Sequence, residues 1–190
     1  AGVAAKHATG TPLVLHVHLP SVMQGIDGHY DSRVYDIEYA AFSVCDAIIA
    51  VSHLVRDAII EKYGVSPEKV FVVHNGVCCD CTDHTKLPIK QHDQLVALFM
   101  GRVTAHKGPD YFIRAAARVH SVLPDAIFIV AGEGEMLFPV IEQAARMGVG
   151  SQTLFVAARY TPEERKTLLH TADVLVMPSV AEPFGIVALE

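Results

Sequence analysis

Tryptophan is absent from this sequence of 190 residues, aromatic side chains make up only 7%, and charged side chains only 19%. Hydrophobic residues nevertheless account for 51% of the chain, which excludes intrinsic disorder because such a chain has enough apolar surface to bury. The apolar residues are mainly Val, Ala, Leu and Ile, the composition of buried parallel strands covered by helices. The formal net charge of -6 argues against a protein that binds nucleic acid or an anionic membrane surface.

No apolar run reaches the ~20 residues that a membrane-spanning helix requires. The richest stretch, 40–55, is interrupted by Asp46 and Ser52. Four cysteines are too few for a disulfide scaffold in a chain of this size, which indicates a reducing compartment. We therefore expect a cytoplasmic protein without a transmembrane segment and leave peripheral attachment to a membrane open. Residues 1–10 show no signal peptide, and residues 184–190 stop without a helix cap, so we expect an internal fragment of a longer chain.

Strand-like and helix-like segments alternate along the chain, a pattern typical of right-handed βαβ units and parallel sheets. Residues 77–94 lose all periodicity and turn polar. We therefore expect an α/β protein with two Rossmann-like domains, at 1–76 and 95–190, joined by a linker at 77–94. The predicted strands are 13–17, 46–52, 69–76, 95–100, 126–132, 153–157 and 174–179. The predicted helices are 32–45, 53–63 (capped by Ser52 and ended by Gly64), 109–122, 135–147, 162–170 and one that begins near Gly185.

Residues 101–110, GRVTAHKGPD, follow a predicted strand and open the next helix. They place Arg102 and Lys107 at a helix N-terminus, where the macrodipole favours anions rather than cations. Two cations make sense there if they share an anion with free backbone N–H groups, and a diphosphate fits this pattern. Gly101 and Gly108 then let the backbone approach the ligand closely. Two solvated surface cations are the alternative interpretation.

Residues 182–190, EPFGIVALE, follow the last predicted strand. Glu182 and Glu190 are eight residues apart, which in a helix places their side chains about 80° apart around the axis. They therefore do not form a carboxylate dyad, and each is expected to accept hydrogen bonds from hydroxyl groups of a polyol ligand. Phe184 and Gly185, at the helix start, offer backbone N–H groups to an anion. An acidic helix cap and a surface glutamate are the alternative interpretation.

Two further stretches follow predicted strands. Residues 131–136, AGEGEM, contain Gly132 and Gly134 but lack the third glycine of a dinucleotide fingerprint. We interpret them as a tight strand-to-helix turn that lines a cleft. His16 and His18 lie on the same side of a strand end. Because a third metal ligand is not evident, we expect His16 to be packed and His18 to contact substrate.

Metal and nucleotide motifs are mostly missing. Cys78, Cys79, Cys81 and His84 are crowded, but without the C-x2-C pairs of a structural zinc site. We expect a plain linker there and keep metal binding as the alternative. The chain contains no Asp-x-Asp clamp for a nucleotide sugar, and no G-x4-G-K-[ST] loop, which excludes a P-loop NTPase. We therefore expect no cofactor and no metal.

Taken together, these motifs resemble those of the retaining GT-B glycosyltransferases of the family-4 and glycogen (starch) synthase type. G-R-x4-K-G is followed by P-S-x2-E-P-F-G-x4-E, and the spaced glutamates match the family's E-x7-E signature. DAIIAVS, KVFVVHNGV and ADVLVMPS occur in the family's order at 46–52, 69–77 and 172–179. The resemblance extends from Leu13 to Glu190 and is carried by Gly101, Arg102, Lys107, Gly108, Pro178, Ser179, Glu182, Pro183, Phe184, Gly185 and Glu190.

The resemblance implies two Rossmann-like domains that face a cleft, both incomplete in this chain. The chain would hold the second half of the acceptor domain, the hinge and the first half of the donor-binding domain. Arg102 and Lys107 match the positions that neutralise the donor diphosphate, and Gly101 belongs to the same donor-binding motif.

The resemblance also assigns the other donor contacts. Glu182 matches the catalytic position near the donor sugar, and Glu190 matches the residue that holds the ribose hydroxyls. Phe184 and Gly185 match the loop whose backbone touches the sugar and the phosphate. His18 matches a histidine that reaches the sugar from the other domain.

Three departures from the family pattern weaken any inference about the acceptor or the nucleotide base. LPSVMQ (19–24) replaces an acidic, hydroxyl-rich stretch after the histidine. Cys78 replaces the aspartate that often follows N-G-V. AARY (157–160) lacks a glycine that is common after the preceding strand.

The resemblance implies metal-independent transfer of a hexosyl unit, first of all glucosyl, from a UDP- or ADP-sugar to a glycan or other hydroxyl acceptor. The family retains the anomeric configuration. A sugar-nucleotide epimerase or phosphorylase on the same architecture is one alternative, and a non-catalytic or truncated nucleotide-sugar-binding module is another. We expect these 190 residues to be inactive by themselves, because both sheets are incomplete. Base, sugar, acceptor and oligomeric state do not follow from the sequence.

Overall fold

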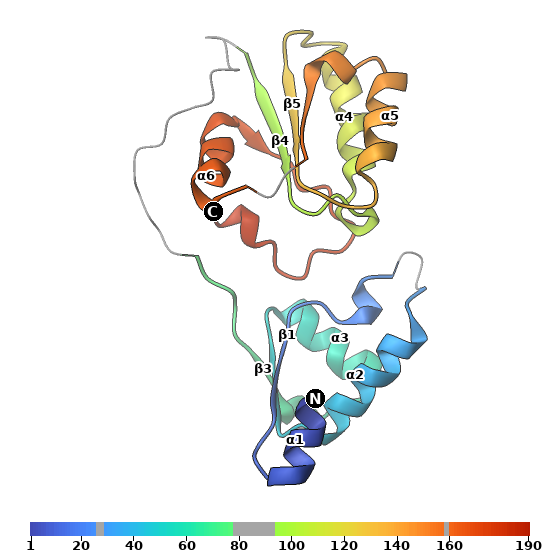
Figure 1. Ribbon diagram of the computed structural model, residues 1–190, viewed down its shortest axis with the longest axis vertical. Coiled ribbons are helices and arrows are strands. Elements are labelled where there is room, and N and C mark those ends of the chain that lie inside the picture. Colours follow the sequence, from blue (N-terminus) through green and yellow to red (C-terminus); the bar gives the residue numbers. More distant parts are fainter. Residues whose placement is uncertain (26–28, 78–93, 158–159) are drawn as a thin grey trace. The chain divides into compact units, whose positions relative to one another are not determined.

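The computed structural model describes residues 1–25, 29–77, 94–157 and 160–190 (Figure 1). The chain divides into two compact units: unit 1 comprises Ala1–Gly76 and Ala181–Ile186, and unit 2 comprises Val77–Val180 and Val187–Glu190. The strands are β1 (Val14–Val17), β2 (Ala47–Ala50), β3 (Val70–Val72), β4 (Val96–Met100), β5 (Ile127–Ala131), β6 (Thr153–Val156) and β7 (Val174–Leu175). The α-helices are α1 (Gly2–Thr9), α2 (Ser32–Val44), α3 (His53–Tyr63), α4 (Pro109–His120), α5 (Leu137–Arg146) and α6 (Pro162–Thr171). Short 3-10 helices are η1 (Ser21–Met23), η2 (Pro67–Lys69), η3 (Ala105–Lys107), η4 (Gly150–Gln152) and η5 (Ile186–Ala188).

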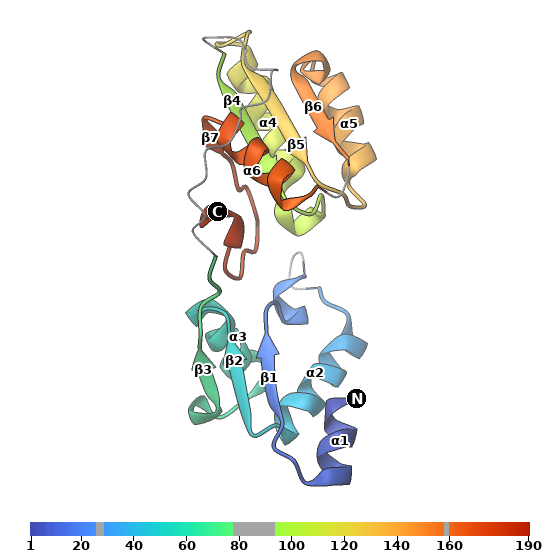
Figure 2. The same ribbon diagram turned by 60° about the vertical axis from the view of Figure 1, so that its left-hand side comes forward.

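Unit 1 contains a three-stranded parallel sheet in the order β1-β2-β3, which Figure 2 shows face on. Its middle strand is buried, with Ile48 and Ala50 both 0% exposed, as expected for a parallel strand covered by helices. Helix α3 is capped at its N-terminus by Ser52, whose hydroxyl accepts a hydrogen bond from the Val55 N–H at 3.2 Å. It ends at Gly64, whose φ of 66° is in the left-handed region. The predicted start and end of this helix are confirmed.

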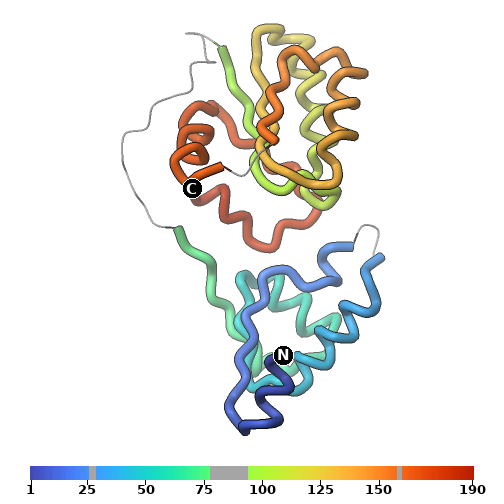
Figure 3. Tube along the Cα trace, in the orientation of Figure 1, coloured from blue at the N-terminus to red at the C-terminus, as the bar shows by residue number. Residues whose placement is uncertain are grey.

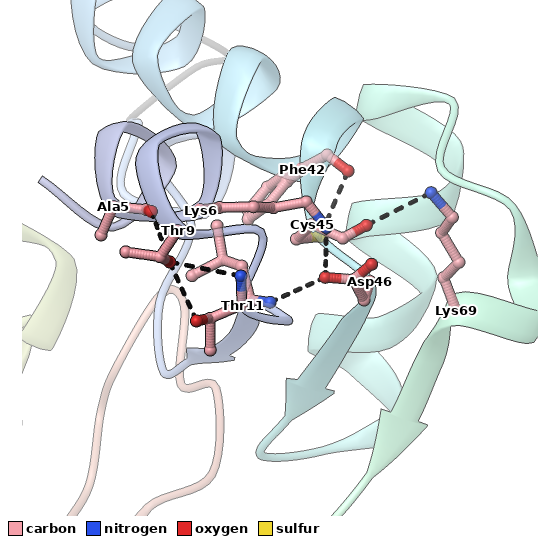
Figure 4. Close-up of polar contacts among 9 residues, drawn as sticks. Ala5, Lys6, Thr9, Thr11, Phe42, Cys45, Asp46 and Lys69 are labelled. Atoms are coloured by element: carbon pink, nitrogen blue, oxygen red, sulfur yellow. Dashed lines mark hydrogen bonds and ion pairs between the residues drawn. The ribbon is translucent and has the colours of Figure 1, made fainter.

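Helix α1 was not predicted, and none of its eight residues is buried. Figure 3 shows this helix turning back into β1. Lys6 attaches it to the sheet, since the Lys6 ammonium pairs with the Asp46 carboxylate beside β2 (Figure 4). The same carboxylate accepts a hydrogen bond from the Leu13 N–H at 2.7 Å. The hydrogen bonds from Lys6 and then Leu13 lower the pKa of Asp46 below its usual value.

A hydrogen-bonded cluster joins η1 to α2 and α3. The carboxylate of Glu38, on α2, accepts hydrogen bonds from the Ser21 and Tyr63 hydroxyls. Ser21 is 3% exposed and Tyr63 is 4% exposed, so the two donor residues are buried, while the acceptor Glu38 is half-buried. Burial first, and the hydrogen bond to Glu38 second, raise the pKa of Tyr63 above its usual value.

Tyr63→Phe is expected to reduce the loss of stability at alkaline pH. In the unfolded chain the phenol ionises at a pKa of about 10, whereas the folded protein holds the proton more tightly. The resulting stabilisation is fully present below about pH 10 and is lost as the pH rises beyond it. Thermal melts between about pH 8 and pH 11 should therefore show a steeper fall in Tm for the wild type than for Tyr63→Phe. Equal slopes of Tm against pH for the two proteins would contradict the inference that burial raises the pKa of Tyr63.

Unit 2 contains a four-stranded parallel sheet in the order β6-β5-β4-β7. Side chains of β4 and β5 alternate between its two faces: Phe99 and Phe128 pack with α4 and α5, and Leu98 and Ile129 pack with α6. Figure 1 shows α4 and α5 on one side of these strands and α6 on the other. The predicted α/β class with two parallel sheets is confirmed.

Several predicted elements are shorter in the structure, among them the strand predicted at 69–76, of which only β3 forms. The strand predicted at 174–179 is only β7, although the Val176 N–H still donates to the Leu98 carbonyl at 2.8 Å. Pro178 has no N–H to continue the ladder. The helix predicted from Gly185 onward is wrong, because only η5 forms there.

Some predictions lie outside the described residues, among them most of the linker 77–94 and the whole group Cys78, Cys79, Cys81 and His84. The structure groups residues 181–186 with unit 1, whereas sequence analysis assigned them to the domain at 95–190. Within the described ranges, no helix combines the length and the apolar character that crossing a membrane requires.

Candidate functional site

The strand order of unit 2 creates a topological switch point. From β4 the chain passes through β5 to β6 on one side, and then returns to place β7 on the other side of β4. The loops that leave the carboxyl ends of β4 and β7, at 101–108 and 176–180, therefore flank this point. Open parallel α/β sheets bind ligands outside the carboxyl ends of their strands at such a position. Topology thus selects the loop that carries Arg102 and Lys107.

The two loops contact each other directly. The Val180 N–H donates a hydrogen bond to the His106 carbonyl at 2.9 Å. Gly108 adopts a φ of 66°, and a Cβ added there would lie 2.4 Å from the Pro178 carbonyl oxygen. Glycine is therefore required at position 108 both for its conformation and for the close approach of the second loop. The motifs G-R-x4-K-G and P-S meet in space.

The start of the first loop packs against the turn that follows β5. The Val103 N–H donates to the Glu133 carbonyl at 2.8 Å. A Cβ on Gly132 would lie 1.8 Å from the Gly101 carbonyl oxygen, and a Cβ on Gly134 would lie 2.2 Å from the Val103 carbonyl oxygen. The two glycines of AGEGEM therefore support the loop at 101–103. The sequence predicted the turn but not this packing, because no local pattern indicates a contact between two separate loops.

The two cations lie in the loop rather than in the first turn of α4. Arg102 is exposed and forms no ion pair with any other residue in the described part of the chain. Lys107 is half-buried and ends η3, two residues before α4 begins at Pro109. Both positive charges therefore stand on the loop at the switch point, where an anionic ligand would meet them.

The predicted supply of free backbone N–H groups at this helix start is partly wrong. The Gly108 N–H already donates to the Ala105 carbonyl at 3.1 Å, and Pro109 has no N–H. The Tyr111 N–H donates to the Gly108 carbonyl at 3.1 Å. The Gly108 and Tyr111 N–H groups are therefore engaged within the loop and the first turn of α4.

Glu190 lies in unit 2 and follows η5 instead of lying inside a helix. Its carboxylate pairs with the Arg165 guanidinium of α6 at 2.7 Å, and its side chain is only 17% exposed. Tyr160 lies close to both charges, and burial raises the pKa of its phenol. Arg165 was not predicted as a partner of Glu190, because only the fold brings α6 beside the C-terminal segment.

The other residues of the EPFG stretch belong to unit 1. The Phe184 ring stacks on the His74 ring with centroids 5.6 Å apart and packs against the core of that unit. Gly185 is buried with a φ of 77°, and Glu182 is half-buried. Each carboxylate of the predicted pair therefore has different surroundings, and the two do not share a helix.

The carboxyl edge of the unit 1 sheet carries several histidines. His18 follows β1, and its ring lies 4.4 Å from the His16 ring, which confirms that the two share one side. Both side chains are exposed, so the prediction that His16 is packed is wrong. His53 and His74, whose rings are 6.0 Å apart, follow β2 and β3 and were missed. Their positions after strands were the available signal.

No metal centre is found within the described ranges, since no group of three or more His, Cys, Asp or Glu residues is placed to hold an ion. Gly101, Arg102, Lys107 and Glu190 lie in unit 2. His18, Glu182, Phe184 and Gly185 lie in unit 1. The predicted donor-binding residues are thus divided between the two units.

Comparison with known proteins agrees with the motifs. The family described as "Glycosyl transferases group 1" matches residues 75–190, and the family described as "Glycosyltransferase Family 4" matches residues 1–80. These matches confirm the family resemblance inferred from the sequence.

Two curated relatives illustrate the similarity. D-inositol 3-phosphate glycosyltransferase 1 of Catenulispora acidiphila is 31% identical over 209 residues, which cover 100% of this chain and 50% of that protein. Glycogen synthase of Mycobacterium tuberculosis is 31% identical over 195 residues, which cover 99% of this chain and 46% of that protein. The chain thus spans about half the length of the curated relatives it matches.

Among solved structures, a TarM variant of S. aureus in complex with fondaparinux, alpha-GlcNAc-glycerol and UDP has a TM-score of 0.73. Its sequence identity is 17%, and the similarity covers 94% of this chain and 34% of that one. At this identity the likeness establishes a shared fold.

Proposed function

Because the chain belongs to the glycosyl transferases of group 1, enzymes of the GT-B fold, we propose that the full-length protein transfers a hexosyl unit from a nucleoside-diphosphate sugar to a hydroxyl acceptor. Glucose is the first candidate for the sugar, since glycogen synthase is among the relatives. The acceptor is a glycan or another hydroxyl compound. UDP and ADP are the candidate nucleotides, and the UDP in the TarM structure supports the first.

One observation carries this proposal: the loop with Arg102 and Lys107 lies at the switch point of the unit 2 sheet. Ligands of such sheets bind at that point. A guanidinium offers a bidentate fork to phosphate oxygens, and an ammonium adds a point charge. A diphosphate is the ligand that best matches this pair.

The proposed role of the two cations follows from the charge that develops on the leaving group. When the bond between the anomeric carbon and the diphosphate oxygen breaks, negative charge grows on the leaving group. Arg102 and Lys107 stabilise that charge, and they do so more in the transition state than in the ground state. The pair supplies the charge that a divalent cation supplies elsewhere, so we propose a reaction without a metal.

We propose that the sugar keeps its anomeric configuration. The acceptor hydroxyl attacks on the face from which the diphosphate leaves, and the departing phosphate oxygen takes the hydroxyl proton. This route uses no protein nucleophile.

The remaining donor contacts follow the family motif. In this proposal Glu182 and His18 contact the sugar, and Phe184 and Gly185 offer backbone N–H groups. Glu190 accepts hydrogen bonds from the ribose. The Arg165 guanidinium pairs with the Oε1 atom of Glu190, so we assign the other carboxylate oxygen to the ribose.

The test is a donor screen with the full-length protein. UDP-glucose or ADP-glucose should give a glycosylated product only when an acceptor is added, and EDTA should leave the initial rate unchanged. Product with inverted configuration, or loss of the rate in EDTA, would overturn those parts of the proposal. Turnover without an acceptor, or dependence on phosphate, would instead favour an epimerase or a phosphorylase.

Glu190→Gln is expected to raise the KM for the donor about 10-fold, because a hydrogen bond to a charged acceptor becomes a weaker neutral one. The preference for a ribose donor over its 2′-deoxy analogue should fall at the same time. Glu142→Gln, on the exposed side of α5, is the matched control and should change neither value. An unchanged preference in Glu190→Gln would remove the ribose role.

A further inference from the structure

The loop that follows β1, at 19–24, is held by a carboxylate from another element. Its η1 turn contains Ser21, and both carboxylate oxygens of Glu38 lie 3.1 Å from the Ser21 backbone nitrogen. The Ser21 hydroxyl also donates to Glu38, so one carboxylate holds both the backbone and the side chain of this residue.

The same carboxylate is held from a second direction. The Tyr63 hydroxyl donates to Glu38 and lies 3.1 Å from the Ser21 hydroxyl oxygen. Tyr63 is itself fixed, because its ring stacks on Tyr35 at 4.7 Å and meets Phe42 edge-on at 4.9 Å. Three donors from two elements therefore converge on Glu38.

Loss of any of the hydrogen bonds to Glu38 is expected to reduce the stability of this part of unit 1. Hydrogen bonds to an ionised acceptor are stronger than neutral ones, and they strengthen further where water is excluded. Ser21 and Tyr63 are almost completely buried, so a lost bond leaves an unpaired donor in the interior. With its oxygens engaged in this way, Glu38 serves to hold the loop rather than to move protons.

The held loop begins directly after His18, at the carboxyl end of β1. Pro20, between His18 and η1, is buried as well. We propose that Glu38 is a positioning residue that fixes the loop at 19–24 and, through it, places His18 for sugar transfer. This proposal rests on the proposed function, in which His18 contacts the donor sugar.

The test compares Glu38→Gln with the wild type in the full-length protein. The kcat for sugar transfer should fall about 10-fold, since small displacements of positioning groups are costly in rate. The Kd for the nucleoside diphosphate, measured by calorimetry, should stay within twofold, because Glu38 is not among the residues proposed to bind the diphosphate. Hydrogen exchange should accelerate at the backbone N–H groups of Ser21 and Gln24. Asp36→Asn, exposed on the same helix, is the matched control and should change none of these values.

Tyr63→Phe keeps the packed ring and removes one bond to Glu38, so it decides the matter if Glu38→Gln does not fold. Faster exchange together with a lower kcat supports the proposal. Faster exchange with an unchanged kcat would show that Glu38 has only a structural role, and this would overturn the proposal. Unchanged hydrogen exchange would overturn the proposal as well. If the wild type transfers sugar from no donor, the proposed function fails instead, and no kcat is measured for either variant.

Discussion

Arg102→Ala in the full-length protein is expected to lower kcat/KM for sugar transfer about 10²- to 10³-fold, the cost of removing one preorganised charge contact to a transition state. The side chain is exposed, so its loss should leave the fold intact and change the chemistry alone. Arg102→Lys should recover only part of the rate, because an ammonium does not reproduce the bidentate fork. Initial rates against donor concentration give the measurement.

Lys107→Ala should have an effect of similar size, and the double variant should lose less than the product of the two, because both charges act on one diphosphate. Arg118→Ala, at an exposed position on α4, is the control and should keep the wild-type rate. If Arg102→Ala and Lys107→Ala each stay within twofold of the wild type, the diphosphate role is wrong. The assignments of the family and the fold would stand, but the assignment of the diphosphate site to Arg102 and Lys107 would be wrong.

Gly132→Ala is expected to destabilise unit 2 by about 3 kcal/mol or more, among the large effects of single substitutions. The added Cβ would lie 1.8 Å from the Gly101 carbonyl oxygen, a backbone atom that moves only if the strands move. The φ of 147° at this position is also unfavourable for alanine. Faster hydrogen exchange along β4 and β5 in the full-length protein would report the loss.

Gly148→Ala separates the two causes. Gly148 has a φ of 75°, but a Cβ there would meet no atom within 4 Å. This variant should therefore lose only the conformational part, about 1 to 2 kcal/mol. Equal losses in the two variants would show that the close approach at Gly132 does not matter.

The sequence predicted the strands and longer helices well, because buried parallel strands are short apolar runs and Gly64 and Ser52 mark the limits of α3. It missed α1, which has no buried residue and is held through the Lys6–Asp46 ion pair. That ion pair joins residues 40 positions apart, which no local pattern can report. The helix predicted from Gly185 does not form, and Phe184, just before it, packs against the core of unit 1.

The candidate site likewise combines features that the sequence predicts with contacts that only the fold creates. The spacing of the two cations and the two glutamates is a property of the sequence, and that spacing is enough to indicate the family. The contacts that these side chains make in the folded protein cannot be predicted from the local sequence. Arg165 contacts Glu190, and His74 stacks on Phe184, only because the chain folds back.

The sequence by itself determined the α/β class, the family and the identity of the charged loop, because hydrophobic period and motif spacing are local properties of the chain. Tertiary structure alone decided the strand order that puts this loop at a switch point, and the partners of Glu38 and Glu190. The physical reason is that strand order and ion pairs involve residues far apart in the chain. The packing of whole helices and strands brings such residues together, and the residues adjacent in the sequence do not determine it.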